Sequence, residues 1–225
     1  MDTKRGTKHF GGLFGWLLVC FLAQMLLEPL FEGSFLAGIL ADGAAYLLLA
    51  FAMLSMKDSF LLYPALVLFV LIMAEYTALA LMPGSALLVA ANFTTSAFLA
   101  IVVLRISLHV TRQTRIGSDA IMGGLCAYTL LGILWTYIYV NLTILNPGSF
   151  AFGPHGPHPD IDQTYALLYY YSFSTMLTVG YGDIIPLSHL AQSLSVIQAL
   201  VGQFFMVFFM AVLVGMYTFG REKAE

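Results

Sequence analysis

The sequence predicts an all-α membrane protein with six transmembrane helices and one shorter re-entrant helix. Three observations lead to this fold class. Of the 225 residues, 60% are hydrophobic and only 9% are charged, against about 25% charged residues in soluble domains. Six apolar runs have the length of about 20 residues that crosses the hydrocarbon core of a bilayer. A seventh apolar run, 164–176, is too short to span and follows a Pro/Gly-rich stretch at 146–159.

The long apolar runs divide the chain into two parts. The first four form a predicted N-terminal domain, residues 1–116, and the last two enclose the short helix in a second domain, residues 117–225. Asp160 or Asp162 is the expected N-cap of the short helix, since aspartate accepts hydrogen bonds from the free N–H groups of a first turn. The predicted spans are 10–28, 34–56, 60–82, 85–105, 119–144 and 189–219.

The basic residues give the predicted topology. If the N-terminus is cytoplasmic, all nine lysines and arginines fall on the cytoplasmic side, as the positive-inside rule requires. This distribution predicts a multi-pass protein of the plasma membrane, or of a bacterial inner membrane, with both termini in the cytoplasm. The sequence has no basic patch, so no nucleic-acid partner is expected. The nine residues are Lys4, Arg5, Lys8, Lys57, Arg105, Arg112, Arg115, Arg221 and Lys223.

The segment 178–183, Thr-Val-Gly-Tyr-Gly-Asp, directly follows the short helix. Binding a dehydrated cation on an axis requires successive main-chain carbonyls to point one way, a geometry that is open to glycine at Gly180 and Gly182. The hydroxyl of Thr178 adds one more oxygen at the inner end. A chance Gly-x-Gly turn explains the two glycines but not the threonine, tyrosine and aspartate that accompany them.

This motif resembles the selectivity filter of the tetrameric potassium-channel family, in which four such loops replace the hydration shell of the ion. The resemblance extends over about 119–220. It implies a homotetramer, with potassium ions and the lipid bilayer as partners. It also implies passive conduction rather than enzymatic activity, with no cofactor apart from potassium ions in the pore. The implied potassium ligands are the carbonyls of Thr178, Val179, Gly180 and Tyr181, and Gly182 completes the filter.

Residues near the filter match the family in part. The pair Tyr170 and Tyr171 stands where many relatives have aromatic residues that brace the filter. Asp183 follows the last glycine, as in the family. Ser174 and Asp183 are, like the two tyrosines, expected to support the filter. Ser174 stands where some relatives have a glutamate, so inactivation of the filter as in those relatives is not expected.

Candidate gating residues lie in the last span. A glycine about 20 residues after the filter commonly bends the inner helix in the family, and this offset leads to Gly202. Close helix packing is the alternative role for Gly202, because small residues are frequent at helix contacts in membranes. Large apolar side chains at Phe205, Phe209 and Val212 are candidates for a constriction that closes by dewetting. The alternative is that they face lipid or a neighbouring helix.

The four N-terminal spans have the layout of a voltage sensor but no ladder of arginines. Arg105, Arg112 and Arg115 cluster at the cytoplasmic end of the fourth span with spacings of seven and three. Because voltage acts only on charges that move, strong voltage gating is not expected. The stretch 105–112 is expected to form an interfacial helix that touches headgroups. The alternative is that its basic residues only follow the positive-inside rule. Two alternative functions remain, a weakly voltage-dependent potassium channel that uses these arginines and a non-conducting regulatory subunit.

Two carboxyl groups lie inside predicted spans, Asp42 in the second and Glu75 in the third. Counted along straight helices, they share a depth of roughly 10 Å with Asn92. Ionisable residues inside a membrane are candidates for function, which predicts a sensor for external protons or cations formed by Asp42, Glu75 and Asn92. The alternative is a neutral, hydrogen-bonded structural cluster. His155, His158 and His189 are a second candidate for a response to external pH.

Overall fold

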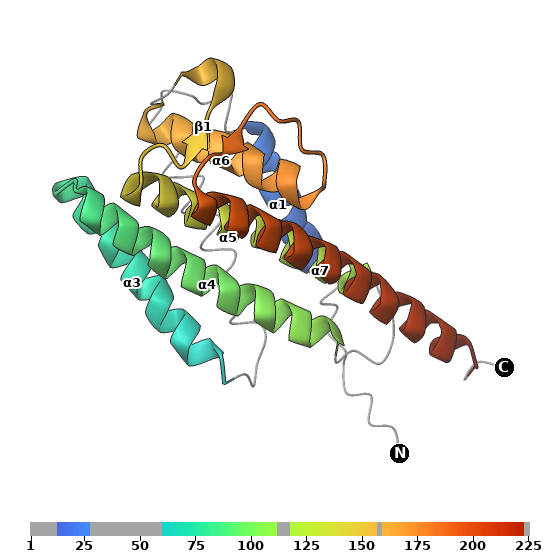
Figure 1. Cartoon of the computed structure of the whole chain (residues 1–225). Helices are drawn as coiled ribbons and strands as arrows, with labels where there is room; N and C mark the ends of the chain where they lie inside the picture. The colour runs from blue at the N-terminus through green and yellow to red at the C-terminus, as the bar shows by residue number, and fades with distance from the viewer. Residues whose placement is uncertain (1–12, 28–59, 112–117, 157–158, 223–225) are drawn as a thin grey trace.

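The computed structural model describes residues 13–27, 60–111, 118–156 and 159–222, and nearly all of them lie in helices (Figure 1). The described strands form a two-stranded antiparallel ribbon, in which Phe150 pairs with Pro186 and Ala151 with Ile185. In chain order the elements are α1 (Leu13–Leu27), α3 (Leu62–Leu81), α4 (Ser85–Thr111), α5 (Ser118–Leu145), β1 (Phe150–Ala151), the 3-10 turn η2 (Gly153–His155), α6 (Ile161–Met176), β2 (Ile185–Pro186) and α7 (His189–Glu222).

Four of the described helices, α3, α4, α5 and α7, are long and apolar enough to cross a membrane. The first predicted span coincides with α1, whose apolar part, Phe14–Ala23, is shorter. The second predicted span, 34–56, lies outside the described residues, so six spans remain a prediction. The predicted domain boundary at residue 116 also lies outside them, between α4 and α5.

The end of α4 differs from the prediction. The helix continues without a break to Thr111 instead of ending near residue 105, because no glycine or proline interrupts it. Arg105 belongs to its buried stripe, together with Phe98 and Val102, and is only 4% exposed. Arg105 thus packs inside the helix bundle, and contact of the stretch 105–112 with headgroups stays a prediction.

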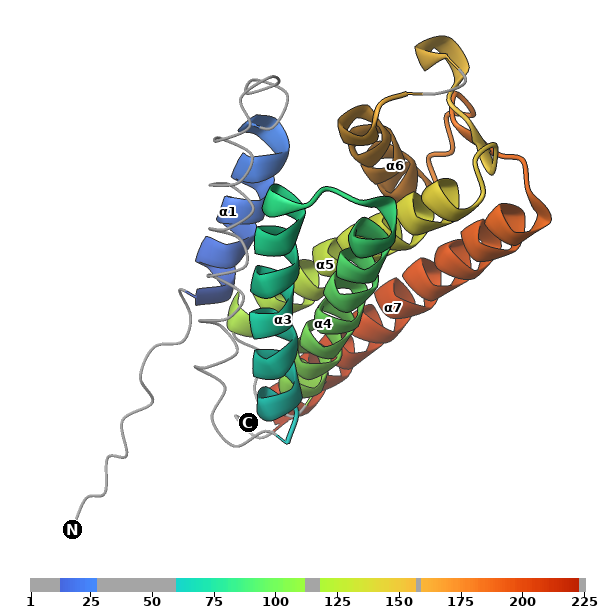
Figure 2. The ribbon, with the colours of Figure 1, turned by 90° about the vertical axis from the view of Figure 1, so that its left-hand side faces the viewer.

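α5 is the central helix of the fold. It packs against α1, α4, α6 and α7, and Figure 2 shows α1 and α7 on opposite sides of it, with α3 and α4 in front. One apolar core fills the space between α1, α3, α4 and α5. A second core joins α5 to α6 and the adjoining loops, around the fully buried ring of Tyr139. Both cores therefore depend on the same helix.

α6 begins at a capped end. Asp160 has extended backbone angles, and its carboxylate accepts a hydrogen bond from the N–H of Gln163 at 2.8 Å. Asp160 is therefore the N-cap, and Asp162 lies in the first turn, where its charge is favourable beside the positive end of the helix dipole. The cap fixes where this short helix starts.

The chain turns back along α5 after the end of α6. The last residue of α6, Met176, contacts Tyr128 in α5, which lies about 25 Å along the helix from the end of α5 at Leu145. After the filter segment the chain returns to the level of that end, since Ile185 pairs with Ala151 in the strand that follows α5. α6 therefore runs along α5 in one direction, and the predicted filter segment runs back in the other.

Candidate ion-conduction site

The filter segment, residues 178–182, is held against the C-terminal end of α6 by main-chain hydrogen bonds. The carbonyl of Ser174 accepts hydrogen bonds from the N–H groups of Val179 at 2.9 Å and of Gly180 at 3.2 Å. The N–H of Thr178 donates to Thr175 at 3.1 Å. Because the last carbonyls of a helix lack partners within the helix, these bonds satisfy both the helix end and the start of the filter segment. Ser174, predicted as a filter-support residue, contributes here through its main chain.

The backbone of the filter segment alternates. Residues 178, 180 and 182 have positive φ angles of 60°, 57° and 80°, whereas Val179 and Tyr181 between them do not. The sequence indicated this geometry for the two glycines but not for Thr178. A β-branched residue in the left-handed region is strained by roughly 1–2 kcal/mol. Such strain is typical of functional segments whose surroundings hold the backbone in place.

Tyr170 and Asp183 brace the outer end of the segment. The ring of Tyr170 stacks on the ring of Tyr181 with centroids 5.9 Å apart and an interplanar angle of 11°. The phenol of Tyr170 also donates a hydrogen bond to the carboxylate of Asp183, and this bond holds the pKa of Asp183 below its usual range. Partial burial and the same hydrogen bond raise the pKa of Tyr170 to about 12. At neutral pH the proton therefore stays on the phenol of Tyr170 and the carboxylate of Asp183 stays charged.

Tyr171 points the other way, into the second core. Its hydroxyl lies 2.6 Å from that of Ser195 in α7, and its ring meets the rings of Tyr139 and Phe150 edge to face at 5.3 Å and 5.2 Å. The two tyrosines predicted as a bracing pair therefore act in different places. Tyr170 contacts the filter segment, and Tyr171 ties α6 to α7.

A buried polar network behind the filter was not anticipated from the sequence. The amide of Gln198 donates to the hydroxyl and the carbonyl of Ser172 at 2.7 Å and 3.0 Å. Gln198 accepts a hydrogen bond from Tyr139 at 2.6 Å, and Ser172 donates to the carbonyl of Gly132 at 2.7 Å. The network joins α5, α6 and α7. Polar residues that interrupt apolar spans were the available signal for it.

Gly202 makes a close contact with the end of α6. A Cβ added there would lie 2.6 Å from Cγ of Met176 and 3.3 Å from its carbonyl oxygen. α7 runs through this position as a continuous helix. Close packing, one of the two roles considered for Gly202, is therefore visible in the structure, and bending remains a prediction.

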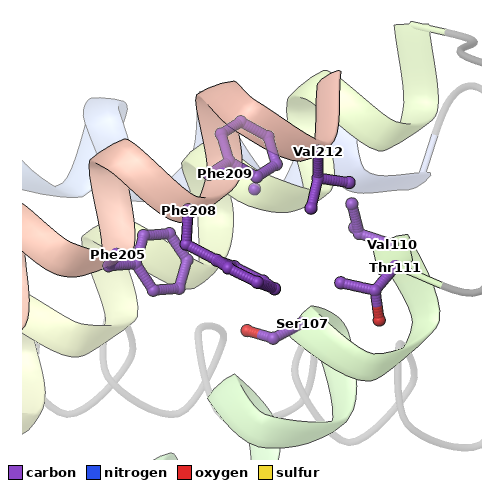
Figure 3. A pocket seen from close by; sticks show the side chains of 8 residues that line it. Ser107, Val110, Thr111, Phe205, Phe208, Phe209 and Val212 are labelled. Atoms are coloured by element: carbon purple, nitrogen blue, oxygen red, sulfur yellow. The ribbon is translucent and has the colours of Figure 1, made fainter. Parts of the chain in front are cut away.

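The other candidate gating residues face α5 and α4. Phe209 lies directly against Gly124, and its ring stacks with that of Phe205 at 6.2 Å. Val212 lines a small apolar pocket between α7 and the C-terminal end of α4. Figure 3 shows Val212 of α7 opposite Ser107 and Thr111 of α4. Within one subunit, these side chains are thus engaged with neighbouring helices, the alternative considered for them.

Of the predicted proton or cation sensor, the structure describes Glu75 and Asn92, which have different hydrogen-bond partners. Glu75 accepts a hydrogen bond from Thr94 at 3.1 Å, which joins α3 to α4. Asn92 instead donates to Asn141 in α5 at 3.0 Å and accepts from Tyr165 in α6 at 2.6 Å. The third member, Asp42, lies outside the described residues, so its distance from Glu75 remains a prediction.

The remaining charged candidates are placed as follows. His155 lies in η2 and is exposed, and its electrostatic interaction with Asp183 helps to lower the pKa of that carboxyl. His189 is the first residue of α7, and His158, Arg112 and Arg115 lie outside the described ranges. Within those ranges no group of three or more His, Cys, Asp or Glu side chains is arranged to hold a metal ion.

Comparison with known proteins supports an ion-conduction site in this region. Residues 160–219 match a family model described as an ion channel. The match covers α6, the filter segment and most of α7. No match was found among curated proteins or solved structures. The match and the four apolar helices together support an integral membrane protein with an ion-channel function.

Proposed function

We propose that this chain is a potassium-selective channel, in which four copies of the segment 178–182 surround one ion axis. The observation that carries the proposal is the alternating backbone of that segment, with positive φ at Thr178, Gly180 and Gly182. This alternation is what aligned carbonyls require. In the proposed pore, the carbonyls of Thr178 to Tyr181 replace the hydration shell of potassium.

The homotetramer follows from the ion chemistry. One loop offers only a few oxygens, so a dehydrated potassium ion needs several copies around it. Exposure in the single subunit supports assembly, because the filter and one face of α7 have large uncovered apolar side chains. These include Val179 at 49% exposed, Tyr181 at 70%, Phe204 at 69% and Val207 at 63%.

The short helix α6 supports cation binding electrostatically. Its C-terminal end, at Met176, lies immediately below the filter segment. The negative end of a helix dipole favours a cation, and four such ends would meet under the filter in a tetramer. In the proposed pore, ions move down their own gradient, so conduction is passive.

Weak voltage dependence is the second candidate function. α4 contains one arginine among its described residues, the buried Arg105, and the end of α4 faces α7 across the pocket of Figure 3. One charge that crosses the whole field contributes about 2.3 kcal/mol per 100 mV. The charge of Arg105 by itself therefore gives only shallow voltage dependence, and we propose that the channel is not strongly voltage-gated. We also propose that both termini lie in the cytoplasm.

Ion flux from purified protein in liposomes tests the proposal. Potassium efflux is expected in a potassium gradient, with little sodium flux in a matched sodium gradient. Gly180→Ala adds a Cβ at φ +57°, where L-residues are strained, and is expected to abolish the preference for potassium. Gly84→Ala is the matched control, since Gly84 has ordinary backbone angles and open space around it. Equal sodium and potassium flux through the unmodified protein would refute the proposal.

A further inference from the structure

Three helices meet at Met176, directly below the filter segment. Met176 ends α6 and is fully buried. From α5, the hydroxyl of Tyr128 donates a hydrogen bond to the main-chain carbonyl of Met176 at 3.0 Å. From α7, Gly202 approaches the same residue so closely that a Cβ would collide with it. Only Leu177 separates this junction from Thr178.

The hydrogen bond from Tyr128 satisfies a carbonyl at the free end of the helix. The nearby N–H groups are used elsewhere, since those of Leu177 and Thr178 donate to Phe173 and Thr175. As described above, those of the next two residues donate to Ser174. The carbonyl of Met176 instead accepts its hydrogen bond from the side chain of Tyr128 in α5. A helix end needs such a donor when its own backbone supplies none.

The ring of Tyr128 also contacts α7. Its centroid lies 5.8 Å from that of Phe205, and Phe205 stacks on Phe209. Tyr128 therefore touches the inner helix with its ring and the base of the filter with its hydroxyl. These two contacts are chemically separable, because phenylalanine retains the first and lacks the second.

We propose that Tyr128 is a positioning residue for the inner end of the filter. Its hydroxyl fixes the carbonyl of Met176 and thereby the direction in which the chain enters Thr178, which would supply the innermost ion ligands. Its ring relays the position of α7 through Phe205. The inference rests on the proposed potassium selectivity and names a residue outside the filter on which that selectivity depends.

The test is Tyr128→Phe in the full-length protein, reconstituted in planar bilayers. Potassium and sodium on opposite sides give the permeability ratio from the reversal potential. The ratio is expected to fall about fivefold, the factor that one neutral hydrogen bond is typically worth. Thr129→Val is the matched control on the same helix. The hydroxyl of Thr129 bonds only within α5, to the carbonyl of Leu125 at 3.0 Å, so its loss should leave the ratio unchanged.

A second variant separates positioning from general packing. Phe205→Leu retains the hydroxyl of Tyr128 but removes the ring contact, so it should change the open probability and leave the permeability ratio unchanged. An equal loss of selectivity in Phe205→Leu and Tyr128→Phe would overturn the proposal, because packing alone would then explain both.

The remaining outcomes decide between the role of Tyr128 and the proposed function. An unchanged ratio in Tyr128→Phe, with a potassium-selective unmodified protein, would refute the role of Tyr128 and leave the proposed function intact. An unmodified protein that passes sodium as readily as potassium would refute both. A Tyr128→Phe protein that fails to assemble on gel filtration would show that the hydroxyl serves folding, and would equally overturn a positioning role.

Discussion

Replacing Gly202 by alanine is expected to push α7 away from the end of α6. The added Cβ would lie 2.6 Å from Cγ of Met176 and 3.3 Å from the main-chain oxygen of the same residue. The side-chain atom has little room to move, because Met176 is fully buried. The main-chain oxygen is fixed by its hydrogen bond from Tyr128. The helix itself must therefore shift.

The size of the effect follows from two opposing terms. Inserting a methyl group into a packed core typically costs about 1–3 kcal/mol. Alanine is favoured over glycine inside a helix by about 1 kcal/mol. Since the collision involves main chain as well as side chain, we expect a net loss of about 1–2 kcal/mol per subunit. The measurement is the thermal unfolding midpoint of the detergent-solubilised protein, with the open probability recorded in bilayers.

Two further variants make this test specific. Gly15→Ala in α1 adds a Cβ that meets nothing within 4 Å, so it should be neutral or stabilising. Met176→Ala removes the colliding atom and costs stability by itself, but in combination with Gly202→Ala the two losses should be less than additive. If Gly202→Ala is as stable as the unmodified protein and only its open probability falls, bending rather than packing explains this glycine.

Two other variants test contacts of the same region. Gly124→Ala should destabilise the protein by about 1–3 kcal/mol, because the new Cβ would occupy the position of the Phe209 ring; an unchanged unfolding midpoint would contradict this packing. Tyr170→Phe should lower the unfolding midpoint by an amount that is constant between pH 5 and 9. The lowered pKa of Asp183 means that its contribution is present above the usual aspartate value of about 3.9 and is lost only as the pH falls below it. The raised pKa of Tyr170 preserves the hydrogen bond until the pH approaches about 12. A difference between the two proteins that changes between pH 5 and 9 would argue against this pair.

Features with a local cause could be predicted from the sequence. The third span was expected at 60–82 and is observed as Leu62–Leu81, since hydropathy and a terminating Pro-Gly pair act within a few residues. The cap at Asp160 has the same local origin. The prediction of a helix too short to span a bilayer came from the length of the apolar run before the filter, and α6 is observed with 16 residues.

The orientation of side chains around the helices could not be predicted in the same way. A helix that is apolar on all sides gives no pattern that distinguishes the side facing lipid from the side facing protein. Phe205 and Phe209 therefore seemed equally suited to a pore and to a core, and the structure packs both towards α5. Depth alone placed Asn92 with Glu75, although the hydrogen bonds of Asn92 lead to α5 and α6 instead.

The position of Asn92 has a consequence for how the N-terminal helices act on the pore helix. Asn92, Asn141 and Tyr165 form a buried chain of hydrogen bonds from α4 through α5 to α6, and the amide of Asn141 also donates to the carbonyl of Val89 at 3.3 Å. A buried polar group left without a partner costs about 1–3 kcal/mol. Sliding α4 along α5 would break several of these bonds together, whereas a joint movement of α4, α5 and α6 would keep them. These bonds therefore fasten α4 to the N-terminal part of α6 in the same chain, while Tyr128 fastens its C-terminal end.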